Sequence, residues 1–261
     1  MTNIQFVPSA ISAGECVSNG WETLKLKYGM YLGISLIAII LTGCVPCLNV
    51  VIMGPVMGGV YYVVLRDMRG EPVDFGMMFK GFEKFVPLMI IGLIQSIPGI
   101  LGQIVQYSVR FAELGLGGRG GRDFDFFQIS DRDFAISSGL MVLFIVLFIG
   151  FMVFSFVWWA VFFFAIPLVI EHDMGAVDAI KLSARAAVSN IGGLFVYFLL
   201  LILVVIVGML MLCLGVFLVS MPVMYIAGAF AYRQVFPWME QQFNMAPPPP
   251  TAYGDFGTRP L

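Results

Sequence analysis

Cys44 and Cys47 are the one pair of cysteines with the two-residue separation typical of redox and metal-binding motifs. A redox thiolate needs a helix N-terminus or a nearby cation to stabilise it, and no charged residue lies between Lys27 and Arg66. Two interpretations stay open. The pair forms a disulfide at an oxidising face, with Cys213 close by, or it supplies small apolar side chains to a hairpin turn. We favour the turn.

His172 is the only histidine, and an acid precedes and follows it. One interpretation is an oxygen-rich metal site, because hard cations prefer carboxylate ligands; it would draw on Asp67, Glu71, Asp74, Glu171 and Asp173. The alternative is an interfacial turn whose acids stabilise the N-terminus of the next helix. A single histidine without a second nitrogen or sulfur ligand at metal spacing favours the turn. We therefore expect neither a metal nor a cofactor.

A third set of residues forms one small and polar helix face. Its members recur at helical spacing, interrupted by Pro98: Gly92, Gln95, Ser96, Gly99, Gly102, Gln103 and Gln106. Such a face either permits close helix packing with amide hydrogen bonds, or lines a polar path or a lipid-headgroup groove. We favour packing and keep a candidate polar path through Gln95, Ser96, Gln103 and Gln106 as the alternative.

Two segments have unusual composition without a complete motif. Residues 115–121 are rich in glycine but lack the Lys-Ser/Thr of a phosphate loop, and paired acids follow them. We interpret this segment as a flexible mixed-charge loop. Pro247 to Pro250 favour an extended polyproline conformation, which suits a stiff linker or a segment that docks to a cytoplasmic partner. The net charge of −2 argues against nucleic-acid binding.

The overall composition indicates whether the protein is surrounded by water or by lipid. Hydrophobic residues make up 60% of the 261 residues and charged residues only 11%, whereas about 25% is usual in soluble domains. A chain with so little charge cannot cover its whole surface with groups that face water. Its main solvent must therefore be lipid.

The charged residues leave four long uncharged gaps, at 28–65, 85–109, 134–170 and 186–232. A helix of about 20 residues crosses the hydrocarbon core, so the first and last gaps hold two spans each and the second holds one. We interpret the third gap as one long helix bent near Pro167. The sequence thus predicts an all-α membrane protein with six transmembrane helices, at 29–47, 49–65, 86–108, 136–163, 191–212 and 214–232. An outer loop covers 109–135, and a Pro-rich cytoplasmic tail covers 238–261.

The positive charges give the orientation, because Lys and Arg near helix ends favour the cytoplasmic side. Six spans with a cytoplasmic N-terminus place ten basic residues inside and four outside, whereas a seventh span would place six inside and eight outside. We therefore expect a multi-pass protein of the plasma (inner) membrane with both termini in the cytoplasm.

Three segments that precede spans are amphipathic, at 12–27, 73–85 and 175–189. Each is too short and too charged to cross a membrane. Each is therefore predicted to be a helix that lies in the interface on the cytoplasmic side.

A short internal repeat accompanies these helices. A Pro-Val-Met motif begins at Pro55 and again at Pro222, and an arginine follows at the same distance, as Arg66 and Arg233. The pattern indicates duplication of a unit made of a surface helix and a helical hairpin. The two copies would cover 15–66 and 178–233.

Four stretches resemble a family of uncharacterised bacterial six-helix inner-membrane proteins, similar in style to the membrane domain found beside some glycerophosphodiester phosphodiesterases. They are GWETLKLKYGMYLGI at 20–34, MGPVMGGVYYVVLRDMRGEPVDFGMMFKGF at 53–82, PLVIEHDMGAVDAIKLSARAAVSN at 167–190 and AYRQVFP at 231–237. The resemblance implies six helices and the same surface helices. It brings no reaction and no catalytic residues, and the Gly-rich loop and the proline tail depart from it.

The expected function follows from where charge is missing. None of the six expected spans contains Asp, Glu, His, Lys or Arg, the groups that membrane enzymes and proton relays need within the bilayer. We therefore expect no enzyme but a scaffold that organises lipids or partner proteins. The alternative is a transporter or channel for a small neutral solute or a lipid, using the Gln-rich face of the third span. The expected partners are the lipid bilayer, other membrane proteins and a cytoplasmic partner of the tail.

Overall fold

The computed structural model describes residues 4–43, 46–116, 131–211 and 214–238, and within them the chain is helical without strands. The elements are α1 (Ala13–Leu26), α2 (Tyr28–Gly43), α3 (Pro46–Asp67), the 3₁₀ helix η1 (Phe75–Lys84), α4 (Phe85–Gln95), α5 (Ile97–Leu116), α6 (Asp131–Phe163), α7 (Ala165–His172), α8 (Ala176–Ser189), α9 (Ile191–Leu210), the π-helical η2 (Val216–Ser220) and α10 (Met221–Val235).

Among these residues, four helical segments are long and apolar enough to cross a membrane: Val50–Asp67, Ile145–His172, Ile191–Leu210 and Val216–Val235. Two bent pairs raise the number to six. These are α1 with α2, bent by 105°, and η1 and α4 with α5, bent by 41°. The chain therefore has the helices of a multi-pass membrane protein.

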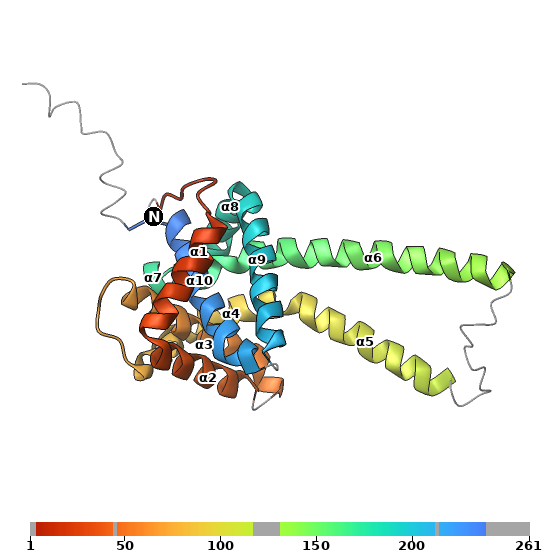
Figure 1. Ribbon diagram of the computed structural model, residues 1–261, viewed down its shortest axis with the longest axis horizontal. Helices are drawn as coiled ribbons and strands as arrows, with labels where there is room; N and C mark the ends of the chain where they lie inside the picture. The colour runs from red at the N-terminus through yellow and green to blue at the C-terminus, as the bar shows by residue number, and fades with distance from the viewer. Residues whose placement is uncertain (1–3, 44–45, 117–130, 212–213, 239–261) are drawn as a thin grey trace, which may run out of the picture.

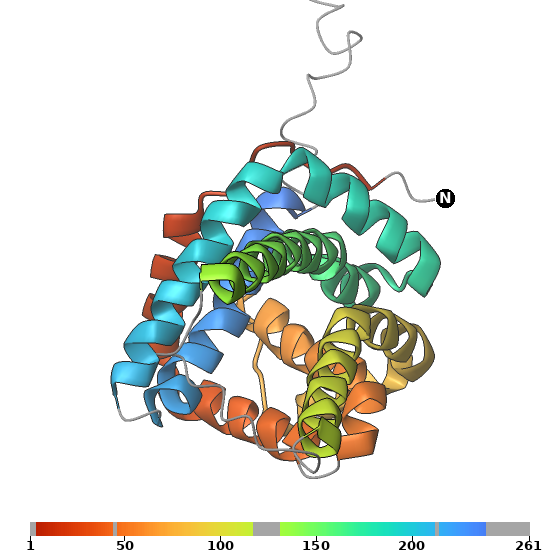
Figure 2. The same ribbon diagram turned by 90° about the vertical axis from the view of Figure 1, so that its right-hand side faces the viewer.

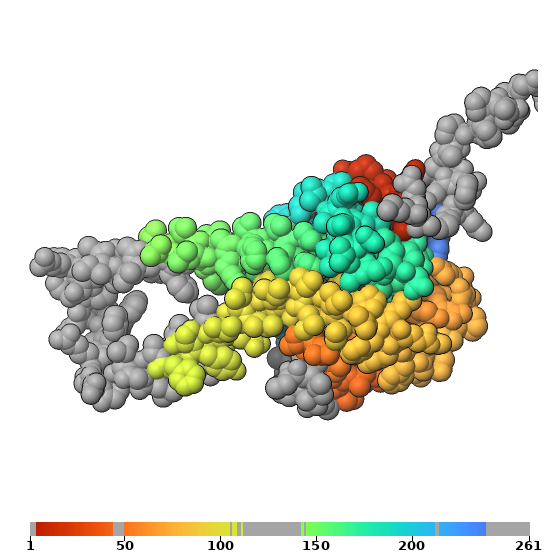
Figure 3. Space-filling model, turned by 180° about the vertical axis from the view of Figure 1, so that it is seen from behind, coloured from red at the N-terminus to blue at the C-terminus, as the bar shows by residue number. Residues whose placement is uncertain are grey.

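Two helices stand apart from the rest. Figure 1 shows a body made by the other helices, from which α5 and α6 extend in the same general direction. Figure 2 looks along α6 and shows the remaining helices arranged around it, with α9 on one side and α2 on another. The space-filling view in Figure 3 shows both helices projecting from one side of the body. Many of their exposed side chains are large and apolar, among them Ile104, Tyr107, Phe148 and Met152.

The first surface helix is present as α1, and its buried face packs against α10. Gly20 allows the close approach, because a Cβ there would lie 3.1 Å from the main-chain nitrogen of Ala227. The helix ends at Lys27, and α2 then turns away. The expected helices 29–47 and 49–65 differ from the structure at their junction, since α2 ends at Gly43 and α3 begins at Pro46. Proline favours the first position of a helix, which explains the earlier start.

The second amphipathic segment is a 3₁₀ helix rather than an α-helix, and glycines let both this helix and α4 pack closely against α3. A Cβ added at Gly59 would overlap the main-chain oxygen of Met78, and one added at Gly54 would overlap that of Leu88. The expected continuous span 86–108 is also divided, since α4 ends at Gln95 and α5 begins at Ile97. Pro98 cannot donate to the carbonyl four residues before it, which accounts for a break in this turn.

The long sixth helix begins earlier than the expected 136–163 and ends at Phe163, before Pro167. Ser183 of α8 bridges the break between α6 and α7. Its hydroxyl donates to the Val161 oxygen at 2.6 Å and accepts from the Phe164 N–H at 3.1 Å. Both main-chain groups are thereby satisfied although the helix is interrupted.

The N-terminal segment fastens the ends of α8 and α10 together. The Val7 N–H donates to the Val235 oxygen at 2.9 Å, and the Ala10 N–H donates to Asn190 Oδ1 at 2.8 Å. Asn190 is buried at the junction between α8 and α9. The start of α9 and the end of α10 therefore lie at the same end of the body.

Candidate functional site

Ion pairs and hydrogen bonds of two lysines join the start of one helix to the end of another. Lys27, at the α1–α2 bend, pairs with Asp67 at the end of α3, and Tyr31 of α2 donates to the same carboxylate at 2.5 Å. Lys84, at the start of α4, donates to two main-chain oxygens in the last turn of α7, at 3.0 and 3.1 Å. It also lies 2.9 Å from Asp173 Oδ1. The start of α2 is thus held beside the end of α3, and the start of α4 beside the end of α7.

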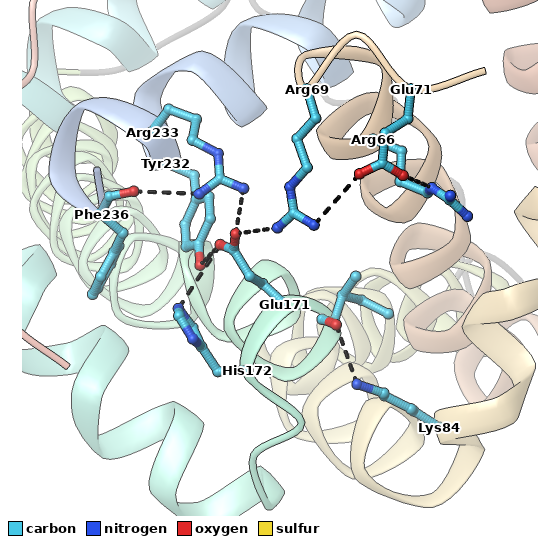
Figure 4. A network of polar contacts seen from close by, with 10 residues as sticks. Arg66, Arg69, Glu71, Lys84, Glu171, His172, Tyr232, Arg233 and Phe236 are labelled. Carbon is cyan, nitrogen blue, oxygen red and sulfur yellow. Dashed lines mark hydrogen bonds and ion pairs between the residues drawn. The ribbon is translucent and has the colours of Figure 1, made fainter. Parts of the chain in front are cut away.

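A group of five residues, here called the ionic cluster, lies where α3, α7 and α10 end: Arg69, Glu171, Tyr232, Arg233 and Trp238. Glu171 Oε1 accepts from Arg69 Nη2 at 2.7 Å and from Arg233 Nη2 at 2.6 Å, as Figure 4 shows. Its other oxygen accepts from the Tyr232 hydroxyl at 2.6 Å. The side chains of Glu171 and Arg233 are only 9% and 8% exposed. The carboxylate is therefore buried with three donors around it.

Trp238 covers both guanidinium groups of the ionic cluster. Its ring centroid lies 3.4 Å from Arg233 Cζ and 4.5 Å from Arg69 Cζ. These are cation–π distances, and they hold the residue that follows α10 against the loop that follows α3. Arg233 also donates from Nη1 to the Phe236 oxygen at 3.5 Å. Its Nε is buried and has no hydrogen-bond partner among the residues that the structure describes.

A second arginine–glutamate pair extends the ionic cluster along the loop after α3. Arg66 Nε lies 2.5 Å from Glu71 Oε2, and its Nη1 donates to the Tyr62 hydroxyl at 3.0 Å. Glu71 Oε1 lies 3.9 Å from Arg69 Nη1. Three arginines therefore face two glutamates, which leaves one positive charge.

These contacts limit the chemistry that the ionic cluster can perform. A general base needs a free lone pair directed at substrate, whereas both oxygens of Glu171 already accept from charged or hydroxyl donors. Guanidinium groups, in contrast, bind carboxylate and phosphate through paired N–H groups. The arrangement is suited to fastening helix ends and to binding an anion.

The acids of the metal interpretation lie in different places. Asp67 pairs with Lys27, Glu71 pairs with Arg66, and Asp74 accepts from the Gly76 N–H at 3.3 Å at the start of η1. His172 Nε2 lies 3.8 Å from Glu171 Oε2. In the part of the chain that the structure describes, no three His, Cys, Asp or Glu side chains gather as they would around a metal ion.

The Gln-rich face is divided by the bend after α4. Gln95 is half-buried at the end of α4, and the Ser96 hydroxyl donates to the Leu93 oxygen at 2.8 Å. Gln103 and Gln106 are exposed on α5, beyond the bend. The four residues of the candidate polar path therefore lie on two helices that differ in direction by 41°.

The cysteine pair cannot be placed in full. Cys44, Cys213 and the side chain of Cys47 lie outside the described residues. Cys16 is described; it is buried in α1, and its thiol donates to Gln234 Oε1 at 3.1 Å.

Sequence reasoning singled out Glu171 and Arg233 but did not connect them. It did not select Arg69, Tyr232 or Trp238 at all. The available signal was that an acid ends the apolar run 134–170 while arginines end the other three. A buried charge needs a partner, so span-end charges of opposite sign are candidates for pairing.

A pocket of about 280 Å³ lies beside the Lys27–Asp67 pair. Leu26, Met68 and Phe230 supply apolar walls, and Thr23 adds a hydroxyl. The pocket is thus formed by the α1–α2 bend, the end of α3 and one face of α10.

The comparisons with known proteins do not extend this description. No family model, curated protein or solved structure matches the chain.

Proposed function

We propose that the chain is a six-span inner-membrane protein with both termini in the cytoplasm, and that it is a non-enzymatic scaffold that organises lipids or partner proteins. Membership of the bacterial six-helix family that it resembles is part of this proposal. The candidate spans support the membrane location, and the ion pairs at their ends support the count and direction of the spans.

The six-span topology is supported by the contacts that bring the start of one span beside the end of another. Lys27 ties the start of α2 to the end of α3, and Lys84 ties the start of α4 to the end of α7. The N-terminal segment holds the start of α9 beside the end of α10. Each of the six candidate spans therefore has one end at this face, which is what a chain that crosses six times requires.

The orientation is supported by the basic residues at that face. Lys27, Arg66, Arg69, Lys84 and Arg233 all take part in its ion pairs. Lysine and arginine near span ends favour the cytoplasmic side. The termini are placed in the cytoplasm on this argument.

The proposed duplication is supported by matching elements. α1, α2 and α3 have the same order as α8, α9 and α10, a surface helix followed by a hairpin. Arg66 lies in the last turn of α3, and Arg233 lies in the last turn of α10. Each arginine binds a glutamate in another segment, Glu71 or Glu171.

The observation that carries the scaffold function is the contrast between the ionic-cluster face and the exposed faces of α5, α6 and α9. Charges at the ionic-cluster face bind one another, whereas α5, α6 and α9 expose long rows of apolar side chains. An apolar surface of this kind is covered in the membrane by lipid chains or by other helices. Collecting such partners is an activity that needs no reactive group.

Purification in native lipid discs tests this proposal. The full chain is extracted with its surrounding membrane, and the co-purifying lipids and proteins are identified by mass spectrometry. A defined lipid enrichment or a stoichiometric membrane partner, absent from a six-helix protein purified in parallel, is expected. A lipid composition equal to that of bulk membrane, with no partner, would contradict the scaffold function.

The transporter alternative is favoured by one observation, the break at Ser96 within the α4–α5 pair. Discontinuous helices commonly form substrate sites in transporters. Gln95 lies directly at this break. Replacement of Gln95, Gln103 and Gln106 by Leu should abolish solute or lipid flux in reconstituted vesicles and leave folding intact, whereas unchanged flux would exclude this path.

A further inference from the structure

Arg233 has one buried donor that no acceptor in the described part of the chain binds. The side chain is 8% exposed, and Nη1 and Nη2 both have acceptors, but Nε has none among residues 4–43, 46–116, 131–211 and 214–238. A buried N–H without an acceptor is unfavourable, because it has lost its hydrogen bonds to water and gained none in the protein. Native proteins seldom leave such a group without a partner, so the orphaned Nε indicates that an acceptor belongs there.

Arg69 supplies a second donor group beside Arg233. Both guanidinium groups bind the same oxygen of Glu171, so they lie next to each other. The Arg69 side chain is 40% exposed, which opens the pair to the surroundings. Trp238 stacks on the faces of both groups. Stacking occupies the faces, and Arg233 Nη1, Arg233 Nη2 and Arg69 Nη2 already have acceptors. An incoming acceptor would therefore bind Arg233 Nε and the remaining N–H groups of Arg69.

The charge balance favours an anion as that acceptor. Arg66, Arg69 and Arg233 face Glu71 and Glu171, which leaves one positive charge. The adjoining Lys84–Asp173 pair is neutral in sum. A singly charged oxyanion would neutralise the remaining charge.

We propose that Arg69, Arg233 and Trp238 form a binding site for a phosphate group. Phosphate accepts paired hydrogen bonds from guanidinium edges. Three of the candidate spans end beside the ionic cluster, at Asp67, His172 and Val235. Lipid headgroups lie at the level where spans end. The phosphodiester of a membrane lipid and free inorganic phosphate share this chemistry, and the experiment separates them. The lipid source rests on the proposed lipid-organising function.

The test is calorimetric titration of the full chain, stripped of lipid in a phosphate-free non-ionic detergent. Three probes are used: short-chain phosphatidylglycerol, the matching diacylglycerol without phosphate, and inorganic phosphate. The variants are Arg69→Gln, which removes the half-exposed donor, and Arg233→Lys, which keeps the charge but removes Nε. Lys80→Gln is the matched control, because Lys80 is an exposed cation on η1 that pairs with Glu83.

Binding of phosphatidylglycerol but not of diacylglycerol, weakened about tenfold in both arginine variants and unchanged in Lys80→Gln, is the expected result. Inorganic phosphate that binds as tightly as the lipid, with the same pattern among variants, supports the site with free phosphate as its source. Equal affinities in the wild type, Arg69→Gln and Lys80→Gln, or no binding of either phosphate probe, would overturn the proposal. Lipid enrichment in native discs would then still stand, so failure of the site and failure of the scaffold function are distinguishable. Arg69 is half-exposed, so its variant keeps the test decisive if Arg233→Lys does not fold.

Discussion

Arg233 of α10 donates a hydrogen bond of 2.6 Å to Glu171 of α7, a residue 62 positions away along the chain. Both side chains are more than nine-tenths buried. A buried ion pair is not in itself a large source of stability, but removing one partner leaves an uncompensated charge. This pair therefore makes the ends of α7 and α10 depend on each other.

Glu171→Gln should destabilise the protein by about 3 kcal/mol, because two arginines and a tyrosine hydroxyl lose their shared carboxylate. Equilibrium unfolding in mixed micelles measures this change. Glu83→Gln is the control, since Glu83 forms an exposed pair with Lys80 and should leave stability unchanged. Equal stability of the two variants would show that the ionic cluster does not hold α7 to α10.

Gly59→Ala should destabilise the protein by about 2 kcal/mol, because the added methyl group would overlap the Met78 main-chain oxygen and push η1 away from α3. Gly150→Ala on α6 meets nothing within 4 Å and should be neutral or slightly stabilising. Thermal unfolding of the two variants in one detergent gives the comparison. A Gly59→Ala protein as stable as Gly150→Ala would contradict the close packing of α3 and η1.

Ser183→Ala should cost about 2 kcal/mol, because it removes both hydrogen bonds that satisfy the break between α6 and α7. Ser108→Ala is the matched control: its hydroxyl donates to the Ile104 oxygen within the same exposed helix turn. Urea titration in mixed micelles measures both. If Ser183→Ala loses no more than Ser108→Ala, the break is not held by Ser183.

Helices could be predicted from the sequence where their residue pattern repeats over a few positions. The amphipathic spacing predicts the helices that appear as α1 and α8, and the uncharged gaps predict the apolar segments that α3, α6, α9 and α10 contain. Periodicity cannot separate a ten-residue 3₁₀ helix from an α-helix, so the form of η1 was not predictable.

The composition of the ionic cluster could not be predicted, because most of its contacts join residues that are far apart in the chain. Arg66 and Arg233 mark span ends by position, but no local pattern tells that one binds Glu71 and the other Glu171. The stacking of Trp238 on two arginines depends on how the loop after α3 approaches the end of α10. Arg66 and Glu71 are only five positions apart, whereas the Arg233–Glu171 pair and the Trp238 stacking arise only when helices distant in the chain have packed.

The central claim is that every candidate span has one end at the ionic-cluster face. Single-cysteine labelling tests it most directly, in a chain whose own cysteines are replaced. Glu22→Cys, Glu83→Cys and Asp178→Cys place an exposed thiol on α1, η1 and α8. Asp123→Cys adds a thiol at a position between α5 and α6 that lies outside the described residues.

A membrane-impermeant maleimide is applied to oriented vesicles from each side. The account predicts that Glu22→Cys, Glu83→Cys and Asp178→Cys are labelled from the cytoplasmic side alone, and that Asp123→Cys is labelled from the opposite side. Labelling of any two of the three surface helices from opposite sides would show that the candidate spans do not all have one end at the ionic-cluster face.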